Sequence, residues 1–121
     1  INSYRNKKGC DIMIIKNAEV QEKVLDEKTT RKILSNGGSL MMVKVTFQKG
    51  GIGEIHSHTD HEQISYIVKG SFEVTVGNHK QILSAGDSFY AGKNTDHGVV
   101  ALEDHSVILD VFTPIREDFL S

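Results

Sequence analysis

Short runs of alternating apolar and polar residues dominate the chain from residue 40 onward. They occupy residues 43–48, 63–68, 71–76 and 107–112. Because side chains two apart in a strand face the same way, each run predicts a β-strand. Turn sequences separate the runs at intervals of roughly ten residues, which predicts an all-β sandwich or barrel. These turns are Lys49-Gly50-Gly51, Lys69-Gly70, Gly77-Asn78, Ala85-Gly86-Asp87 and Gly92-Lys93-Asn94. We expect the aromatic residues Tyr66 and Tyr90 to pack in the core or to line a cavity.

The chain reads as one domain with a short N-terminal extension. Its 121 residues are the size of a single domain, and no internal repeat or linker is visible. We expect residues 1–12 to be an extension that is disordered or strand-swapped, and residues 13–121 to be the β-barrel domain. The composition of residues 16–27 predicts a short helix. Cys10 is the single cysteine, so a disulfide within the chain is excluded and a spectator role is expected.

The composition limits the classes of binding partner and the cellular location that we expect. Hydrophobic residues make up 38% and charged residues 25% of the chain, as in soluble globular proteins. The net charge is −2 with no basic block, which argues against nucleic acid as a partner. No apolar run approaches the roughly 18 residues that a membrane span needs, and the N-terminus shows no apolar stretch typical of a signal peptide. We therefore expect a cytoplasmic protein that binds neither nucleic acid nor membrane.

The sequence contains a His-x-His pair, His56 and His58. Both imidazoles can point to the same side of a strand, and imidazole nitrogens bind divalent metals. A pair of this kind on an exposed strand is, however, more often plain polar surface. A metal site needs further ligands, and the chain offers His97 together with Glu62 or Gln63 a few positions after the pair.

The glycines around the histidine pair give it more weight, because residues 50–70 resemble the first motif of the cupin family. The matching residues are Gly50, His56, His58, Gln63 and Gly70. Residues 86–97 resemble the second motif through Gly86, Asp87 and His97. The usual proline, glycine and asparagine of that motif are replaced by Gly92, Asn94 and Ala101. The resemblance implies a single-domain cupin, which is a jelly-roll barrel or double-stranded β-helix.

The cupin resemblance also implies one divalent metal held by His56, His58, Gln63 and His97. Counting back seven residues from Gly70 selects Gln63, and alternation places its neighbour Glu62 on the opposite face. All four ligands are neutral, so they leave the charge of the metal uncompensated and make it a Lewis acid that favours an anionic ligand. Oxygen chemistry, which suits carboxylate-bearing iron sites, is less favoured. Zn, Ni, Mn, Fe, Co and Cu remain candidate metals.

The C-terminal segment contains further candidate catalytic and binding residues. Asp110 and Phe112 share one face of their predicted strand, and Arg116 follows shortly after it. Beside a metal they would supply an acid–base group, an aromatic wall and a two-point carboxylate binder. The pattern equally allows Asp110 on the outside and Arg116 in a surface ion pair with Glu117 or Asp118.

The His-Ser-His segment, the strand at 64–70 and the residues Asp110, Phe112 and Arg116 together resemble the KdgF family of pectin-degradation cupins. That resemblance implies ring opening and ketonisation of 4,5-unsaturated uronates released by pectin and alginate lyases. The substrate is then an anionic sugar, and Asp110, Phe112 and Arg116 belong to the active site. A homodimer is implied too, in line with edge strands that pair between subunits. The alternatives are a non-catalytic cupin that binds a sugar or anion, and a metal-dependent dioxygenase.

Overall fold

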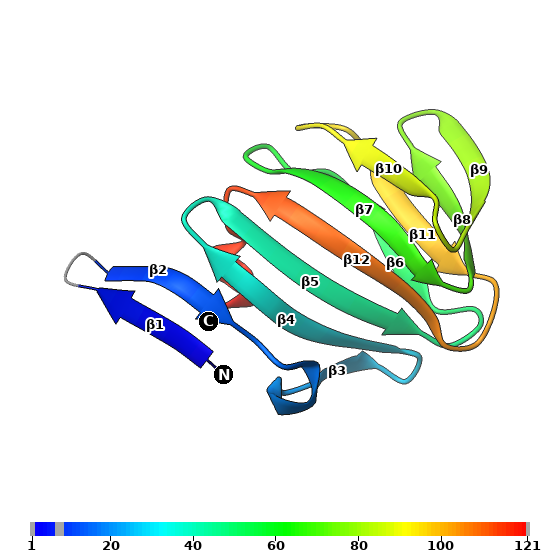
Figure 1. The fold of residues 1–121 in the computed structure, drawn as a ribbon. Coiled ribbons are helices and arrows are strands. Elements are labelled where there is room, and N and C mark those ends of the chain that lie inside the picture. The colour runs from blue at the N-terminus through cyan, green and yellow to red at the C-terminus, as the bar shows by residue number, and fades with distance from the viewer. Residues whose placement is uncertain (1, 7–8, 121) are drawn as a thin grey trace.

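The computed structural model describes residues 2–6 and 9–120, and its regular secondary structure is almost entirely β-strand. Figure 1 shows its elements in chain order. The strands of the described chain are β1 (Asn2–Asn6), β2 (Gly9–Ile14), β3 (Lys23–Asp26), β4 (Thr29–Gly37), β5 (Leu40–Phe47), β6 (Ile52–His56), β7 (Glu62–Lys69), β8 (Ser71–Val76), β9 (His79–Ser84), β10 (Ser88–Ala91), β11 (His97–Ala101) and β12 (Ser106–Thr113). Two short 3-10 turns are η1 (Asn17–Glu19) and η2 (Glu117–Phe119). Within these residues, no helix is long and apolar enough to cross a membrane.

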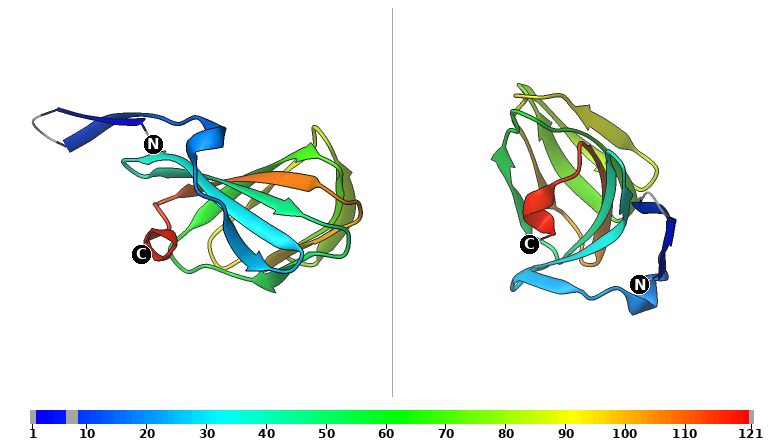
Figure 2. Two further views of the ribbon diagram at one scale, coloured as in Figure 1. Left: turned by 90° about the horizontal axis from the view of Figure 1, so that it is seen from below. Right: turned by 90° about the vertical axis from the view of Figure 1, so that its left-hand side faces the viewer.

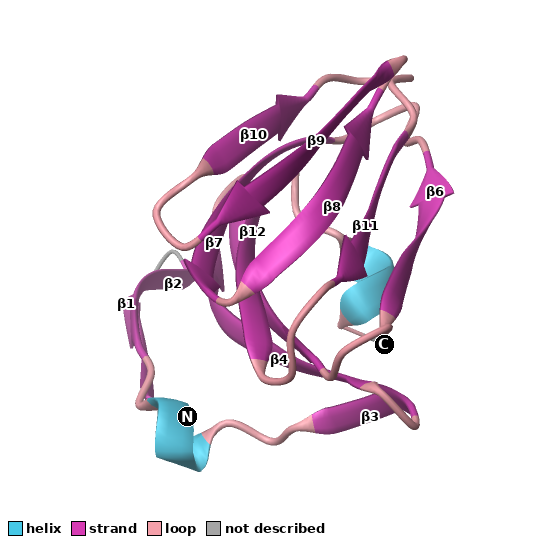
Figure 3. Cartoon of the chain, turned by 90° about the vertical axis from the view of Figure 1, so that its right-hand side faces the viewer, coloured by secondary structure: helices cyan, strands magenta, loops and turns pink. Residues whose placement is uncertain are grey.

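Two antiparallel sheets enclose a common interior. The six-stranded sheet has the order β10-β7-β12-β5-β4-β3, and the four-stranded sheet has the order β6-β11-β8-β9. Figure 3 shows the smaller sheet in front of the larger one, and Figure 2 shows both sheets curving around the same space. In Figure 2 the C-terminal turn η2 lies at one end of this barrel. The predicted all-β jelly-roll barrel is therefore confirmed.

The core follows the alternation of β5. Met41, Val43, Val45 and Phe47 are buried, whereas the residues between them are partly exposed. Phe47 meets Phe72 of β8 edge to face, with ring centroids 5.3 Å apart. Since β5 and β8 belong to different sheets, this aromatic pair ties the two layers together.

The alternation of β7 has the reverse sense, with its polar residues inside the barrel. Gln63 and Ser65 are 6% and 0% exposed, whereas Ile64 and Tyr66 are 55% and 47% exposed. Tyr90 of β10 lies opposite Ile64 and is 55% exposed. The prediction that Tyr66 and Tyr90 lie in the core or the cavity is therefore wrong. Gln63 and Ser65 turn inward, where they form hydrogen bonds with each other and with Asp110 of β12, and Ile64 and Tyr66 cover the outside of the sheet.

The helix predicted for residues 16–27 is also wrong. Only Asn17–Glu19 makes a 3-10 turn, and the following strand β3 pairs with β4 instead. Helix propensity is a weak prior, and an open sheet edge satisfies the backbone N–H and C=O groups of this segment equally well. Lys32 and Lys44 each donate a hydrogen bond to the side chain of Asn17, which fixes the turn against the sheet.

The N-terminal segment forms a hairpin of its own. Strands β1 and β2 pair with each other in a separate two-stranded sheet, and β2 also contacts β4. The division between an extension at 1–12 and a domain at 13–121 stays a prediction, and that boundary falls within β2. Residues 1, 7–8 and 121 and the side chain of Cys10 lie outside the described part of the chain.

Gly70 holds the tight turn between β7 and β8. Its φ of +78° is a conformation that side chains disfavour. A Cβ atom at this position would overlap the side chain of Ser106 and lie 2.9 Å from its Cα. The glycine that ends the first motif is thus required by the close passage of the chain at Ser106.

Candidate metal centre

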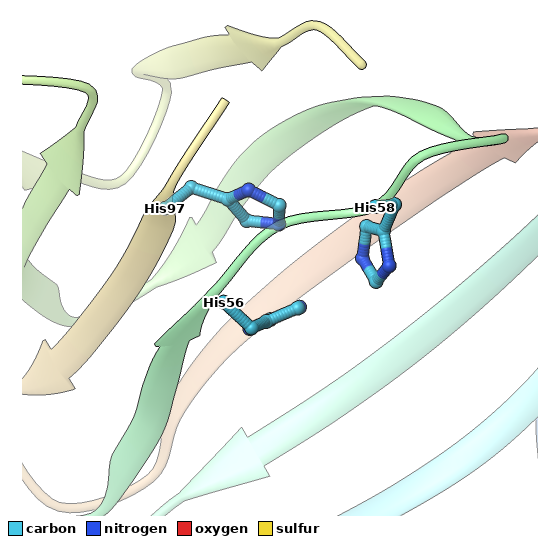
Figure 4. A group of neighbouring side chains, drawn as sticks. All are labelled: His56, His58 and His97. Atoms are coloured by element: carbon cyan, nitrogen blue, oxygen red, sulfur yellow. The ribbon is translucent and has the colours of Figure 1, made fainter. Parts of the chain in front are cut away.

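Three histidines from two neighbouring strands meet at one end of the barrel. His56 ends β6, His58 lies in the loop that follows, and His97 begins β11 directly opposite His56. The ring centroid of His56 lies 4.7 Å from that of His58 and 4.5 Å from that of His97. One ligand nitrogen from each ring lies within 4.8 Å of the others, and Figure 4 shows the three rings converging. This spacing suits a shared metal ion.

Backbone carbonyls orient two of these rings. His56 Nδ1 lies 2.6 Å from the carbonyl oxygen of Glu54, and His97 Nδ1 lies 2.9 Å from that of Thr95. Because a carbonyl oxygen only accepts, both Nδ1 atoms carry the proton and both Nε2 atoms present a lone pair. His97 Nε2 is buried and has no hydrogen-bond partner among the described residues. A bound metal would satisfy this orphaned nitrogen.

The environment favours the neutral form of His58, which is partly buried, and of His97, which is buried. Burial, followed by the positive charge of Arg116 and the other imidazoles, lowers the pKa of His58 to about 4. Burial also lowers the pKa of His97. Metal ligation requires the neutral form, so these rings need lose no proton near pH 7 to bind a cation.

Gln63 reaches the same interior from β7. Its Nε2 donates to Ser65 Oγ at 2.9 Å and lies 3.5 Å from Asp110 Oδ1. With the amide nitrogen directed to these groups, Oε1 is the atom that remains to ligate a metal. Glu62 lies on the other face, where its carboxylate accepts a 2.8 Å hydrogen bond from the hydroxyl of Tyr90. The structure therefore separates the two candidates as alternation predicted, and Gln63 as a fourth ligand stays a prediction.

Asp110 faces inward from β12 and joins this polar group. Its Oδ1 accepts a 2.6 Å hydrogen bond from Ser65 Oγ. Burial raises its pKa to about 6, although the Ser65 hydroxyl, His56 and Arg116 each act in the opposite direction. A carboxyl group with such a pKa populates both protonation states near neutral pH, as general acid–base catalysis requires.

Phe112 and Arg116 lie on the C-terminal side of the site. Phe112 is buried, with its ring centroid 6.3 Å from that of His58. Arg116 Nη1 lies 3.3 Å from His58 Nε2, and the guanidinium sits 5.3 Å from the Phe112 ring centroid. Its Nε and Nη2 donate to Asp118 at 3.0 and 2.8 Å. Arg116 thus makes the ion pair with Asp118 and reaches the histidine cluster at the same time.

A cavity of about 280 Å³ connects these groups. The predicted residues in its lining are His56, Gln63, His97, Asp110, Phe112 and Arg116. Sequence reasoning missed Ser65, which links Gln63 to Asp110, and Arg31, which lines the cavity from β4. Ser65 lies two residues after Gln63, so alternation could have placed it on the same face. Arg31 gave no local signal, because its position depends on the pairing of β4 with β5.

Known proteins resemble this chain in both sequence and structure. A family model described as Cupin domain matches residues 43–112. The pectin degradation protein KdgF of Dickeya dadantii strain 3937 is 50% identical over 96 residues, which cover 79% of this chain and 87% of that protein. The structure of KdgF from Halomonas sp. matches with a TM-score of 0.83 and 42% identity, covering 85% of this chain and 94% of that one.

A further solved structure supports the same assignment. An RmlC-like cupin from Shewanella frigidimarina matches with a TM-score of 0.81 and 36% identity, covering 87% of this chain and 93% of that one. The family match extends over more than half of the chain, and the identity to the Dickeya protein extends over most of that relative. The chain therefore belongs to the cupins and, within them, to the KdgF family.

Proposed function

We propose that this protein catalyses ring opening and ketonisation of 4,5-unsaturated uronates from pectin or alginate breakdown. The observation that carries the proposal is the position of Asp110. This carboxyl group has a pKa of about 6 and is hydrogen-bonded through Ser65 to Gln63, in one cavity with His56 and His97. The relationship to a pectin degradation protein supports a uronate as the substrate.

The side chains present fit one divalent transition metal. His56, His58 and His97 would hold it, with Gln63 Oε1 as the proposed fourth ligand. When bound, such an ion supplies a Lewis acid that polarises the oxygen atoms of a sugar. Zn, Ni, Mn, Fe, Co and Cu all accept imidazole and amide oxygen ligands, so the ligand set leaves the metal identity open.

Proton transfer falls to Asp110. In ring opening, the C1 hydroxyl of the sugar loses its proton as the bond between C1 and the ring oxygen breaks, and the released ring oxygen takes up a proton. The C5 enol that results becomes a ketone when its hydroxyl proton is lost and a proton adds to C4. A carboxyl group near its pKa can accept a proton from oxygen and return one to carbon. Ser65 holds the carboxyl group in a single orientation, and Phe112 shapes the wall of the pocket.

Arg116 cannot bind a substrate carboxylate through its Nε and Nη2 edge. The edge formed by Nε and Nη2 is occupied by Asp118, so only Nη1 is directed to the site. We therefore propose that Arg116 places one N–H donor and a positive charge beside the bound sugar.

The test follows the loss of ultraviolet absorbance of unsaturated galacturonate after addition of metal-loaded protein. The wild type should accelerate the decay well beyond the spontaneous rate, and Asp110→Asn should lose this acceleration while retaining its metal. Asp87→Asn, in the turn before β10, is the matched control and should behave as wild type. No acceleration by metal-loaded wild type would contradict the proposal. Oxygen uptake by the iron-loaded protein would then indicate a dioxygenase, and tight sugar binding without turnover a binding module.

We also propose that two copies associate through β3. This strand lies at the edge of the six-stranded sheet, and all four of its residues are exposed, Val24 at 69%. An unprotected strand edge is a template for pairing with a second chain. Sedimentation velocity should give twice the monomer mass for the wild type and the monomer mass for Val24→Lys. A monomeric wild type would contradict the proposal.

A further inference from the structure

A second arginine lines the cavity from β4 of the six-stranded sheet. Arg31 lies on β4 directly across from Val45 of β5, whose side chain is buried. Thr29, two residues earlier on the same face, is also buried and lines the cavity together with Arg31. Alternation along β4 therefore turns the Arg31 side chain into the barrel.

The carboxylate of Asp118 is the negative charge that acts on Arg31, and Asp118 makes its salt bridge with Arg116. Its guanidinium carbon lies 4.0 Å from the centroid of the Phe119 ring, which stacks with Arg116 as well at 4.2 Å. No salt bridge involves Arg31, and its Nε is buried without a hydrogen-bond acceptor among the described residues. An arginine held in this way has a buried N–H donor without an acceptor, which an anionic ligand in the cavity would supply.

Three of the acidic groups nearby have hydrogen-bond or salt-bridge partners of their own. Asp118 pairs with Arg116, Asp110 accepts the hydroxyl of Ser65, and Asp26 accepts the backbone N–H of Lys28. Burial, and next the repulsion from Arg116, lowers the pKa of Arg31, whereas the charge of Asp118 acts in the opposite direction. The guanidinium groups of Arg31 and Arg116 both contact the Phe119 ring, and the carboxylate of a ligand would add a negative charge beside them.

We propose that Arg31 binds the carboxylate of the sugar acid in the cavity and makes the site selective for uronates over neutral sugars. The proposal rests on the proposed function in taking a uronate as the substrate. A guanidinium offers two parallel N–H donors that match the two oxygens of a carboxylate. Arg116 cannot offer its Nε and Nη2 edge in the same way, because Asp118 already occupies it.

The test compares two unreactive ligands, galacturonate and its methyl ester, by calorimetric titration of metal-loaded protein. The ester lacks the negative charge of the carboxylate and carries one additional methyl group. Wild type should bind galacturonate more tightly, and Arg31→Gln should weaken galacturonate about 10- to 100-fold while leaving the ester unchanged. Arg31→Lys keeps the charge without the planar pair of donors and should fall between the two.

Lys32→Gln is the matched control, since it removes a charge from the next residue of the same strand. The Lys32 side chain bonds Asn17 on the outside of the barrel, so both ligands should bind as in wild type. Equal affinity of wild type for acid and ester would overturn the assignment. So would an equal loss for both ligands in Arg31→Gln, which would indicate a structural role. These binding results do not depend on turnover, so an inactive wild type would refute the proposed reaction and leave this assignment standing.

Discussion

Ser65 Oγ donates a 2.6 Å hydrogen bond to Oδ1 of Asp110 and connects two strands inside the barrel. The same hydroxyl oxygen accepts from Nε2 of Gln63 at 2.9 Å. One buried serine thus orients both a proposed metal ligand and the proposed acid–base group. Gln63, Ser65 and Asp110 thus form a single hydrogen-bonded unit.

Removal of this hydroxyl should weaken both the fold and the activity. Ser65→Ala leaves the amide of Gln63 and the carboxyl group of Asp110 without their shared partner, and an unsatisfied buried polar group costs about 1–3 kcal/mol. We expect the free energy of unfolding, measured by denaturant titration, to fall by that amount and kcat to fall with it. Ser88→Ala on the exposed side of β10 is the control, and its stability should stay within about 0.5 kcal/mol of wild type.

The neutral amide at position 63 should matter for chemistry more than for metal retention. Gln63→Glu offers the metal a carboxylate, which offsets its charge, and places a second acid 3.5 Å from the oxygen of Asp110. We expect the metal to remain bound and turnover to fall roughly tenfold or more. Metal content after dialysis and the absorbance assay measure the two effects.

Glu62→Gln provides the comparison, because its side chain lies outside the barrel with the hydroxyl of Tyr90. Metal content and turnover should both match wild type. Loss of metal in Glu62→Gln, or wild-type turnover in Gln63→Glu, would show that the ligand was assigned to the wrong neighbour.

Metal binding should appear as thermal stabilisation that depends on His97. A ligand present at 100 times its dissociation constant stabilises the folded state by about 2.7 kcal/mol. We expect the Tm of chelator-treated protein to rise on addition of a divalent metal, and His97→Ala to lose this response. His79→Ala changes an exposed residue at the start of β9 and should respond as wild type does. An unchanged metal response in His97→Ala would exclude that ring from the site.

Much of the fold and of the histidine cluster could be predicted from the sequence, because both depend on the local spacing of residues. Alternation located β5 and β12, and the motif glycines with His56 and His97 located the cluster that the structure brings together. The first half of β7 is oriented against its hydrophobic pattern because its polar residues form hydrogen bonds with the carboxyl group of Asp110 inside the barrel. The position of Arg31 depends on the pairing of β4 with β5, which local spacing does not show. Local spacing also allowed either Glu117 or Asp118 as the ion-pair partner of Arg116, and the structure shows Asp118.

The motif glycine at position 70 should be far less tolerant of substitution than a glycine elsewhere in the barrel. Gly70→Ala adds a Cβ that overlaps Ser106 and forces a side chain into a backbone conformation with φ of +78°. Strain of this kind costs about 1–3 kcal/mol before the overlap is counted, so we expect a larger loss in unfolding free energy. Gly37→Ala is the matched control, because its Cβ would meet no atom within 4 Å and its φ is not in the left-handed region. Denaturant titration of both variants measures the difference, and equal stabilities would show that the turn at Gly70 relaxes around the added methyl group.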